Sequence, residues 1–122
     1  MFENVVVGFN DSDDAARAMH RAMDVARSSG GTLHVVSVGD STAKVSSLGR
    51  LLDEVRALAD SVAVPMKVHP LNVEPAEAIT SVATEEQADL IIMGAPLCDG
   101  ARRLSRVPQR VLDEAPCAVM VV

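Results

Sequence analysis

Residues 88–94, "ADLIIMG", indicate a β-strand that is buried on both of its faces. The run is short, almost entirely apolar and closed by a glycine. Such runs are typical of the central strands of parallel sheets, whereas half-exposed strands alternate apolar and polar residues. This stretch therefore favours a sheet with helices on both sides.

Short apolar runs alternate with segments of helical periodicity along the whole chain, as in a parallel sheet covered by helices. Further strands are predicted at residues 4–9, 32–38, 64–71 and 117–122. Helices are predicted after the polar cluster at residues 10–14, over residues 43–61, from Pro75 onward and over residues 108–114. The order predicts one α/β domain, residues 1–122, with an open, mostly parallel, five-stranded doubly wound sheet flanked by four helices, Rossmann-like in form.

Doubly wound sheets bind ligands at the carboxyl ends of their strands, where the winding reverses. Asn10 follows the first predicted strand, and Gly94 ends the strand at residues 88–94. We therefore expect both residues to lie near any ligand.

Composition and charge exclude several classes of protein. The net charge of -6 opposes nonspecific binding to nucleic acid or to anionic lipid, so neither is expected as a partner. The sequence contains no apolar run of about 18 residues and no signal-peptide pattern at its start, which predicts no membrane span and a cytoplasmic location. The two cysteines fit a reducing compartment as free thiols.

Four blocks of the sequence resemble the universal stress protein family. They are "VVVGFNDS" at residues 5–12, "EPAEAI" at residues 74–79, "ADLIIMG" followed by "DGARRL" at residues 99–104, and "DEAPCAVMVV" at residues 113–122. The resemblance covers essentially the whole chain and implies a strand order of 3-2-1-4-5.

Nucleotide-binding members of that family carry the pattern G-x2-G-x9-G-[S/T], in which glycines let the backbone approach the phosphates. Laid on this sequence, its four positions fall on Gly94, Leu97, Val107 and Pro108, so that one of the four residues is retained. Side chains at Leu97 and Val107 occupy space that a phosphate would need, and Pro108 removes an amide donor.

The family's nucleotide binders also place an aspartate at the end of the first strand, where this chain has Asn10. The change removes a charge-assisted acceptor for the nucleoside. By the same alignment Val38 and Met93 keep the hydrophobic lining. We therefore expect no cofactor and no tight binding of ATP.

An alternative is that the chain binds or slowly hydrolyses ATP through the arginine-rich loop. An arginine side chain can hold a phosphate without a glycine cradle. The candidate anion contacts are Arg102, Arg103, Arg106 and Arg110.

Metal binding is not predicted. His20, His34 and His69 have no paired spacing, such as i and i+4, that would chelate an ion. The acidic cluster at residues 11–14 is explained by helix capping and the helix dipole. A response-regulator receiver domain would need an aspartate after the third strand and a lysine after the fifth, and neither is present.

Cysteine chemistry leaves one weaker option open. Cys98 lies beside arginines in the loop, which would lower the pKa of a thiol and let it react with oxidants. Cys117 lies in an apolar strand and is expected to be inert.

The family strand order makes residues 64–71 and 117–122 the two edge strands. Pro65, Lys67 and Pro70 discourage pairing at the first edge, whereas the second carries no such residue. Dimeric family members pair this terminal strand antiparallel, and an uncovered apolar edge gives a physical reason for the same arrangement here. The predicted dimer strand consists of Cys117, Ala118, Val119, Met120, Val121 and Val122.

The combined expectation is a cytoplasmic, homodimeric regulatory or interaction module of the stress response. It has no catalytic activity of its own, and the sequence does not identify its protein partner.

Overall fold

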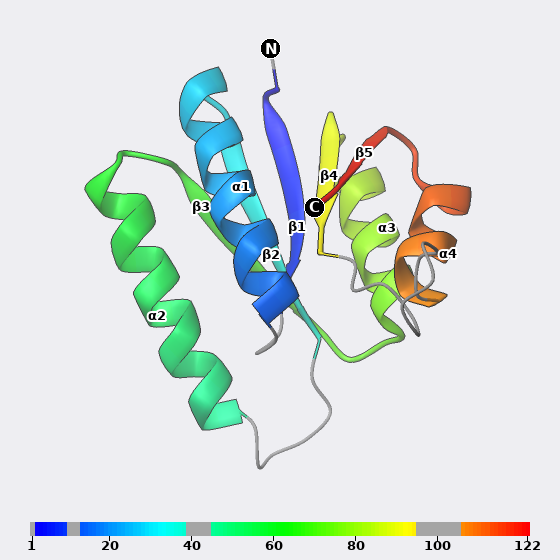
Figure 1. Ribbon diagram of the computed structural model, residues 1–122, viewed down its shortest axis with the longest axis horizontal. Helices are drawn as coiled ribbons and strands as arrows, with labels where there is room; N and C mark the ends of the chain where they lie inside the picture. Colours follow the sequence, from blue (N-terminus) through cyan, green and yellow to red (C-terminus); the bar gives the residue numbers. More distant parts are fainter. Residues whose placement is uncertain (1, 10–12, 39–44, 95–105) are drawn as a thin grey trace.

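The computed structural model of the chain describes residues 2–9, 13–38, 45–94 and 106–122 (Figure 1). Strands and helices alternate along these residues. They are β1 (Asn4–Phe9), α1 (Asp13–Ser29), β2 (Thr32–Val38), α2 (Val45–Ser61), β3 (Met66–Leu71), α3 (Pro75–Glu85), β4 (Leu90–Met93), α4 (Arg106–Glu114) and β5 (Ala118–Val121).

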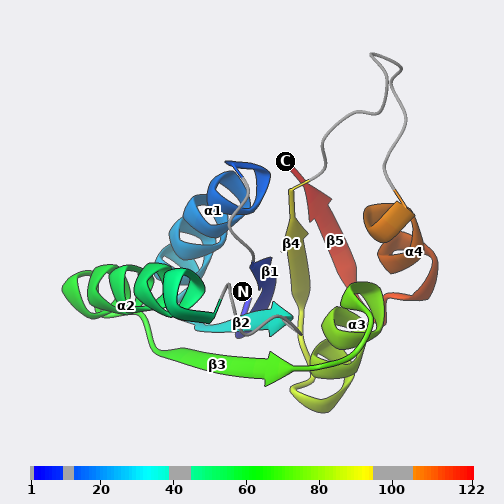
Figure 2. The same ribbon diagram turned by 90° about the horizontal axis from the view of Figure 1, so that it is seen from below.

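The strands form one sheet in the order β3-β2-β1-β4-β5, and all four neighbouring pairs are parallel. This confirms the predicted five-stranded doubly wound fold, its strand order and its two edge strands. Helices α1 and α2 cover one face of the sheet, and α3 and α4 cover the other (Figure 2). The winding reverses where β4 pairs with β1.

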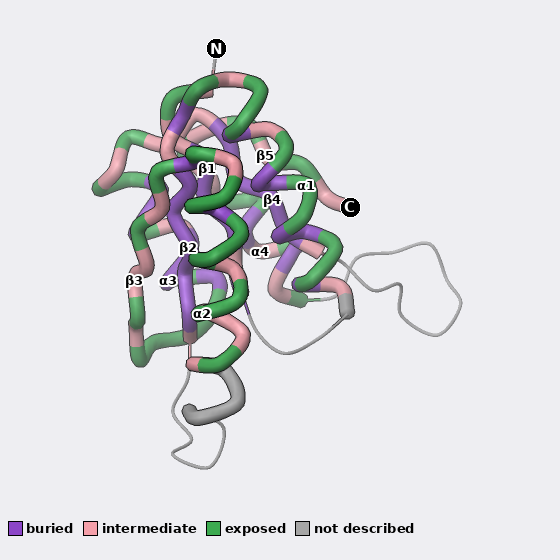
Figure 3. Tube along the Cα trace, turned by 90° about the vertical axis from the view of Figure 1, so that its left-hand side faces the viewer, coloured by how far each residue is buried: buried purple, intermediate pink, exposed green. Residues whose placement is uncertain are grey.

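Two apolar clusters, one on each face of the sheet, make up the core. Alternate residues of the central strands point to opposite faces, so Val5 and Val7 belong to the cluster under α1, while Val6 joins the cluster under α3 and α4. All residues of β4 are buried, which confirms the predicted burial for residues 90–93, while Ala88, Asp89 and Gly94 at the ends of the predicted run are half-buried. Figure 3 shows the buried positions gathered along the central strands.

Some element bounds differ from those predicted. Helix α4 begins at Arg106, two residues before Pro108, because proline is tolerated in the first turn of a helix, where the amides lack helical partners. Helix α2 begins at Val45 and β3 at Met66, each about two residues later than expected. Among the described helices, none is long and apolar enough to cross a membrane.

Gly94 brings the end of β4 into close contact with the start of α1. A Cβ atom added at Gly94 would lie 2.2 Å from the carbonyl oxygen of Asp14 and 2.5 Å from its carbonyl carbon. Neither backbone atom can move without shifting the helix. Only glycine fits this position at the observed separation of α1 and β4.

We predict that Gly94→Ala lowers the free energy of unfolding by about 1–3 kcal/mol or more, because it overpacks a backbone contact. Gly49→Ala is the matched control, since a Cβ added at Gly49, within α2, meets nothing within 4 Å. That control should raise the stability by about 0.5–1 kcal/mol, the usual gain for alanine over glycine in a helix. Urea denaturation followed by far-ultraviolet circular dichroism measures both. A Gly94→Ala protein as stable as wild type would show that α1 is not held against β4 as described.

Candidate functional site

The predicted nucleotide site lies at the carboxyl ends of the strands, around the point where the winding reverses. The structure describes five of its positions, which are Val38, Met93, Gly94, Val107 and Pro108. Other predicted residues lie outside the described part of the chain, and these are Asn10, Leu97, Cys98, Arg102 and Arg103.

Three of the described positions share one apolar cluster on the face covered by α3 and α4. Met93, the last residue of β4, is buried, with a relative exposure of 4%. Val38, which ends β2, and Val107, in the first turn of α4, are half-buried and pack against the same cluster. All three residues thus belong to or pack against one apolar cluster, and Val107 packs its half-buried side chain against the core.

The first turn of α4 is poorly equipped to hold a phosphate. Helix N-termini bind anions through amides that have no partner within the helix. Pro108 is the third residue of α4, is buried and has no N–H to donate. The neighbouring Val107, in the same turn, packs its aliphatic side chain against the apolar cluster.

Arg110, one of the predicted anion contacts, is paired with two carboxylates. Its Nη1 donates to Glu74 Oε2 over 2.6 Å, and its Nε donates to Glu114 Oε1 over 3.3 Å. Glu74 also caps α3, because the same Oε2 accepts from the amide of Glu77 over 3.2 Å. An external anion would have to compete with these carboxylates for Arg110. Arg106, the first residue of α4, is exposed.

The close contact at Gly94 gives that glycine a role in packing that requires no ligand. Of the four positions of the family pattern, Gly94 alone matches, and a side chain there would collide with Asp14. Its presence in the chain is therefore explained without a nucleotide.

The predicted dimer strand forms an edge of the sheet and is partly exposed. Met120 in β5 has a relative exposure of 36%. It is one of the large apolar residues that are exposed in the described part of the chain. Cys117 lies just before β5, and burial, assisted by the charge of Asp89, raises the pKa of its thiol. A raised pKa disfavours the reactive thiolate, in agreement with the expected inertness.

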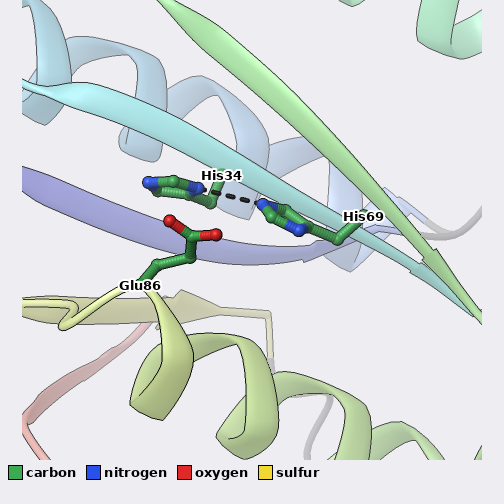
Figure 4. Close-up of side chains that lie close together, drawn as sticks. All are labelled: His34, His69 and Glu86. Carbon is green, nitrogen blue, oxygen red and sulfur yellow. Dashed lines mark hydrogen bonds between the residues drawn. The ribbon is translucent and has the colours of Figure 1, made fainter.

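A second group of polar side chains, which we call the histidine cluster, consists of His34, His69 and Glu86. The Nδ1 atom of His34 lies 3.0 Å from Nε2 of His69, and the carboxylate of Glu86 faces both rings (Figure 4). Sequence spacing gave no sign of this group, because the histidines lie on different strands. The one feature of the sequence that could have predicted the cluster is that the strands carrying His34 and His69 were expected to be neighbours in the sheet, which does not by itself predict that the two side chains meet.

The environment of His34 favours its neutral form. Its side chain is only 1% exposed, and its Nε2 lies 3.0 Å from Oδ1 of Asn4. Burial lowers the pKa of His34, while the nearby charge of Glu86 acts in the opposite direction. A neutral imidazole keeps one nitrogen lone pair free to accept a proton or bind an ion.

Comparison with known proteins agrees with this fold and with the family that the sequence resembles. The family model for the universal stress protein family matches residues 1–122. A universal stress protein of Thermus aquaticus, described as lying in the QAH/OAS sulfhydrylase 3' region, is 32% identical over 136 residues, covering 100% of this chain and 99% of the relative.

Solved structures are similar as well. A universal stress protein crystallised in complex with cAMP is 27% identical, with a TM-score of 0.81 over 99% of this chain and 96% of its own. A universal stress protein from Archaeoglobus fulgidus in complex with dAMP, at 22% identity and a TM-score of 0.78, covers 98% of this chain and 96% of its own and supports the fold alone. The chain belongs to the universal stress protein family.

Proposed function

We propose that this chain is a regulatory or interaction module of the stress response that binds ATP weakly or not at all and catalyses no reaction. The observation that carries the proposal is the first turn of α4, where the half-buried Val107 packs against the core and the buried Pro108 lacks an amide proton. A phosphate at this turn would meet aliphatic carbon and one donor fewer than usual.

The expected loss of affinity for ATP is large enough to move a micromolar site toward the millimolar range. The chain departs from the binding pattern at Asn10, at Leu97 and at the pair Val107 and Pro108. If each of these three departures costs about 1 kcal/mol or more, a micromolar site weakens by about two decades toward the millimolar range.

A second candidate function is nucleotide binding through the arginine-rich segment. A similar universal stress protein was solved in complex with cAMP, and Arg106 is exposed at the start of α4. A positive side chain beside a helix N-terminus favours a phosphate in the same place. This candidate requires that cations compensate for the missing glycines.

We predict that titration calorimetry with Mg-ATP, AMP and cAMP finds no dissociation constant below about 0.1 mM for the wild-type chain, given the penalties above. Restoring the family pattern with Asn10→Asp, Leu97→Gly, Val107→Gly and Pro108→Ser together should tighten ATP binding by about 100-fold. A variant with Asn10→Asp alone separates the nucleoside contact from the phosphate cradle. Micromolar ATP binding by wild type would support the second candidate and contradict the first.

We also propose that the chain forms a two-fold dimer by antiparallel pairing of β5. This proposal is supported by the sequence and position of β5, which is an edge strand of four apolar residues, "AVMV", without proline or charge. An uncharged apolar edge strand readily pairs with another strand. The other edge, β3, carries Lys67 and Pro70. Pairing would cover the exposed Met120 and satisfy the free backbone groups of β5.

We predict that wild type sediments at twice the chain mass of 12.9 kDa at micromolar concentration and that Met120→Lys sediments as a monomer. Lysine on an edge strand opposes pairing, and the exposed side chain of Met120 can be changed without loss of core packing. Leu112→Lys is the control, because Leu112 on α4 is 44% exposed but lies off the strand. A monomeric wild type, or a Met120→Lys protein that remains dimeric, would rule out pairing through β5.

A further inference from the structure

The histidine cluster gathers three potential metal ligands from three different elements. His34 lies on β2, His69 lies on β3, and Glu86 follows the last residue of α3. One ligand atom from each residue lies within 4.8 Å of the others. Two imidazoles and a carboxylate form a donor set that suits divalent first-row transition metals.

Asn4 fixes the orientation and the tautomer of His34. Its Oδ1 atom can only accept, so Nε2 of His34 carries the hydrogen in this 3.0 Å contact. In the neutral ring, Nδ1 then presents its lone pair toward His69. Metal-binding histidines are usually held in this way by a hydrogen bond from the second ring nitrogen.

The spacing of the two rings is close to that of a metal site. Nδ1 of His34 and Nε2 of His69 lie 3.0 Å apart, and two nitrogens bound tetrahedrally at about 2.0–2.1 Å lie about 3.3 Å apart. Without an ion, Nε2–H of His69 donates to Nδ1 of His34. When an ion binds, the hydrogen of His69 moves to its Nδ1, and both facing nitrogens offer lone pairs.

Glu86 is not needed for this hydrogen-bond chain. The carboxylate of Glu86 faces the rings of His34 and His69 (Figure 4). Within the described part of the chain, it makes no hydrogen bond to either ring. His69 and Glu86 are half-buried, so the cluster is open to solvent on one side. Water can complete the coordination there, as in metal sites with three protein ligands.

We propose that His34, His69 and Glu86 bind one divalent transition metal ion, with Zn²⁺ as the representative ion. The ion joins the end of α3 to the edge strand β3 through the buried β2. The nearby ammonium group of Lys67 opposes a cation, and the carboxylate of Glu86 offsets this charge.

The proposed metal site is separate from the nucleotide site. Asn4 is the first residue of β1 and His34 the third of β2, so both lie toward the amino ends of their strands, and His69 is the fourth of the six residues of β3. Val38 and Met93, in contrast, end their strands. The metal proposal therefore stands or fails independently of the proposed function.

The test is a titration of untagged, metal-free protein with Co²⁺ and then Zn²⁺. We expect a visible cobalt d–d absorption that saturates at one equivalent of Co²⁺, with a dissociation constant below about 100 µM. Adding Zn²⁺ should then abolish this absorption, because Zn²⁺ displaces Co²⁺ from the site. His69→Gln and Glu86→Gln should each weaken binding by at least about 100-fold, because loss of a residue that only hydrogen-bonds to a metal ligand already costs about 10–100-fold. His20→Gln, at an exposed position on α1, and Cys98→Ser should leave the titration unchanged.

A measurement on the wild-type chain guards against variants that fold poorly. The chain has 3 histidines, so the ring resonances of His34, His69 and His20 can be compared directly. Co²⁺ should broaden or shift those of His34 and His69 and leave that of His20 in place. The proposal is overturned if the wild-type chain binds neither Co²⁺ nor Zn²⁺ at 1 mM, or if either ligand variant keeps wild-type affinity. It is also overturned if the resonances of His20 respond as those of His34 and His69 do. In each of these cases the cluster is a hydrogen-bond network alone.

Discussion

The pairing of β1 with β4 is the interaction on which the rest of the structure depends. Val5, Val6 and Val7 lie opposite Leu90, Ile91 and Ile92, and all six residues are buried. Because β2 occupies the other side of β1, this pairing reverses the winding and sends α3 and α4 to the face opposite α1 and α2. It also brings the end of β4 against α1, where the backbone of Asp14 leaves room only for Gly94.

The sheet face beneath α3 and α4 combines two chemically different regions. Toward the carboxyl ends, Met93 is buried in an apolar cluster, and Val107 packs against the same cluster. Nearer the amino ends of β1 and β2, His34 forms a polar cluster with His69 and Glu86. Apolar side chains pack together in the first region, and the second region offers two imidazoles and a carboxylate.

Much of the fold was predictable from local sequence. The apolar run at residues 88–94 and the strands at residues 4–9 and 32–38 were assigned correctly, because burial on both faces leaves a clear pattern. Helix bounds were less certain, since α4 begins before Pro108 rather than at it. The strand order came from the resemblance to the family and not from periodicity.

The contacts between distant side chains could not be predicted in this way. His34 and His69 meet diagonally across β2 and β3, which depends on a register that aligns Val36 with His69. Arg110 was a candidate anion contact, and it donates to Glu74, the residue that caps α3, through a contact set by how α3 and α4 pack. Such contacts depend on tertiary geometry, which neither composition nor spacing encodes.

The central claim is that the first turn of α4 has lost its capacity to hold a triphosphate. A crystal structure of the wild-type chain grown with millimolar Mg-ATP tests it most directly. The account predicts no ordered triphosphate at Val107 and Pro108, with Val107 still packed in the apolar cluster. A fully occupied triphosphate against this turn, with its γ-phosphate held by backbone amides, would contradict it.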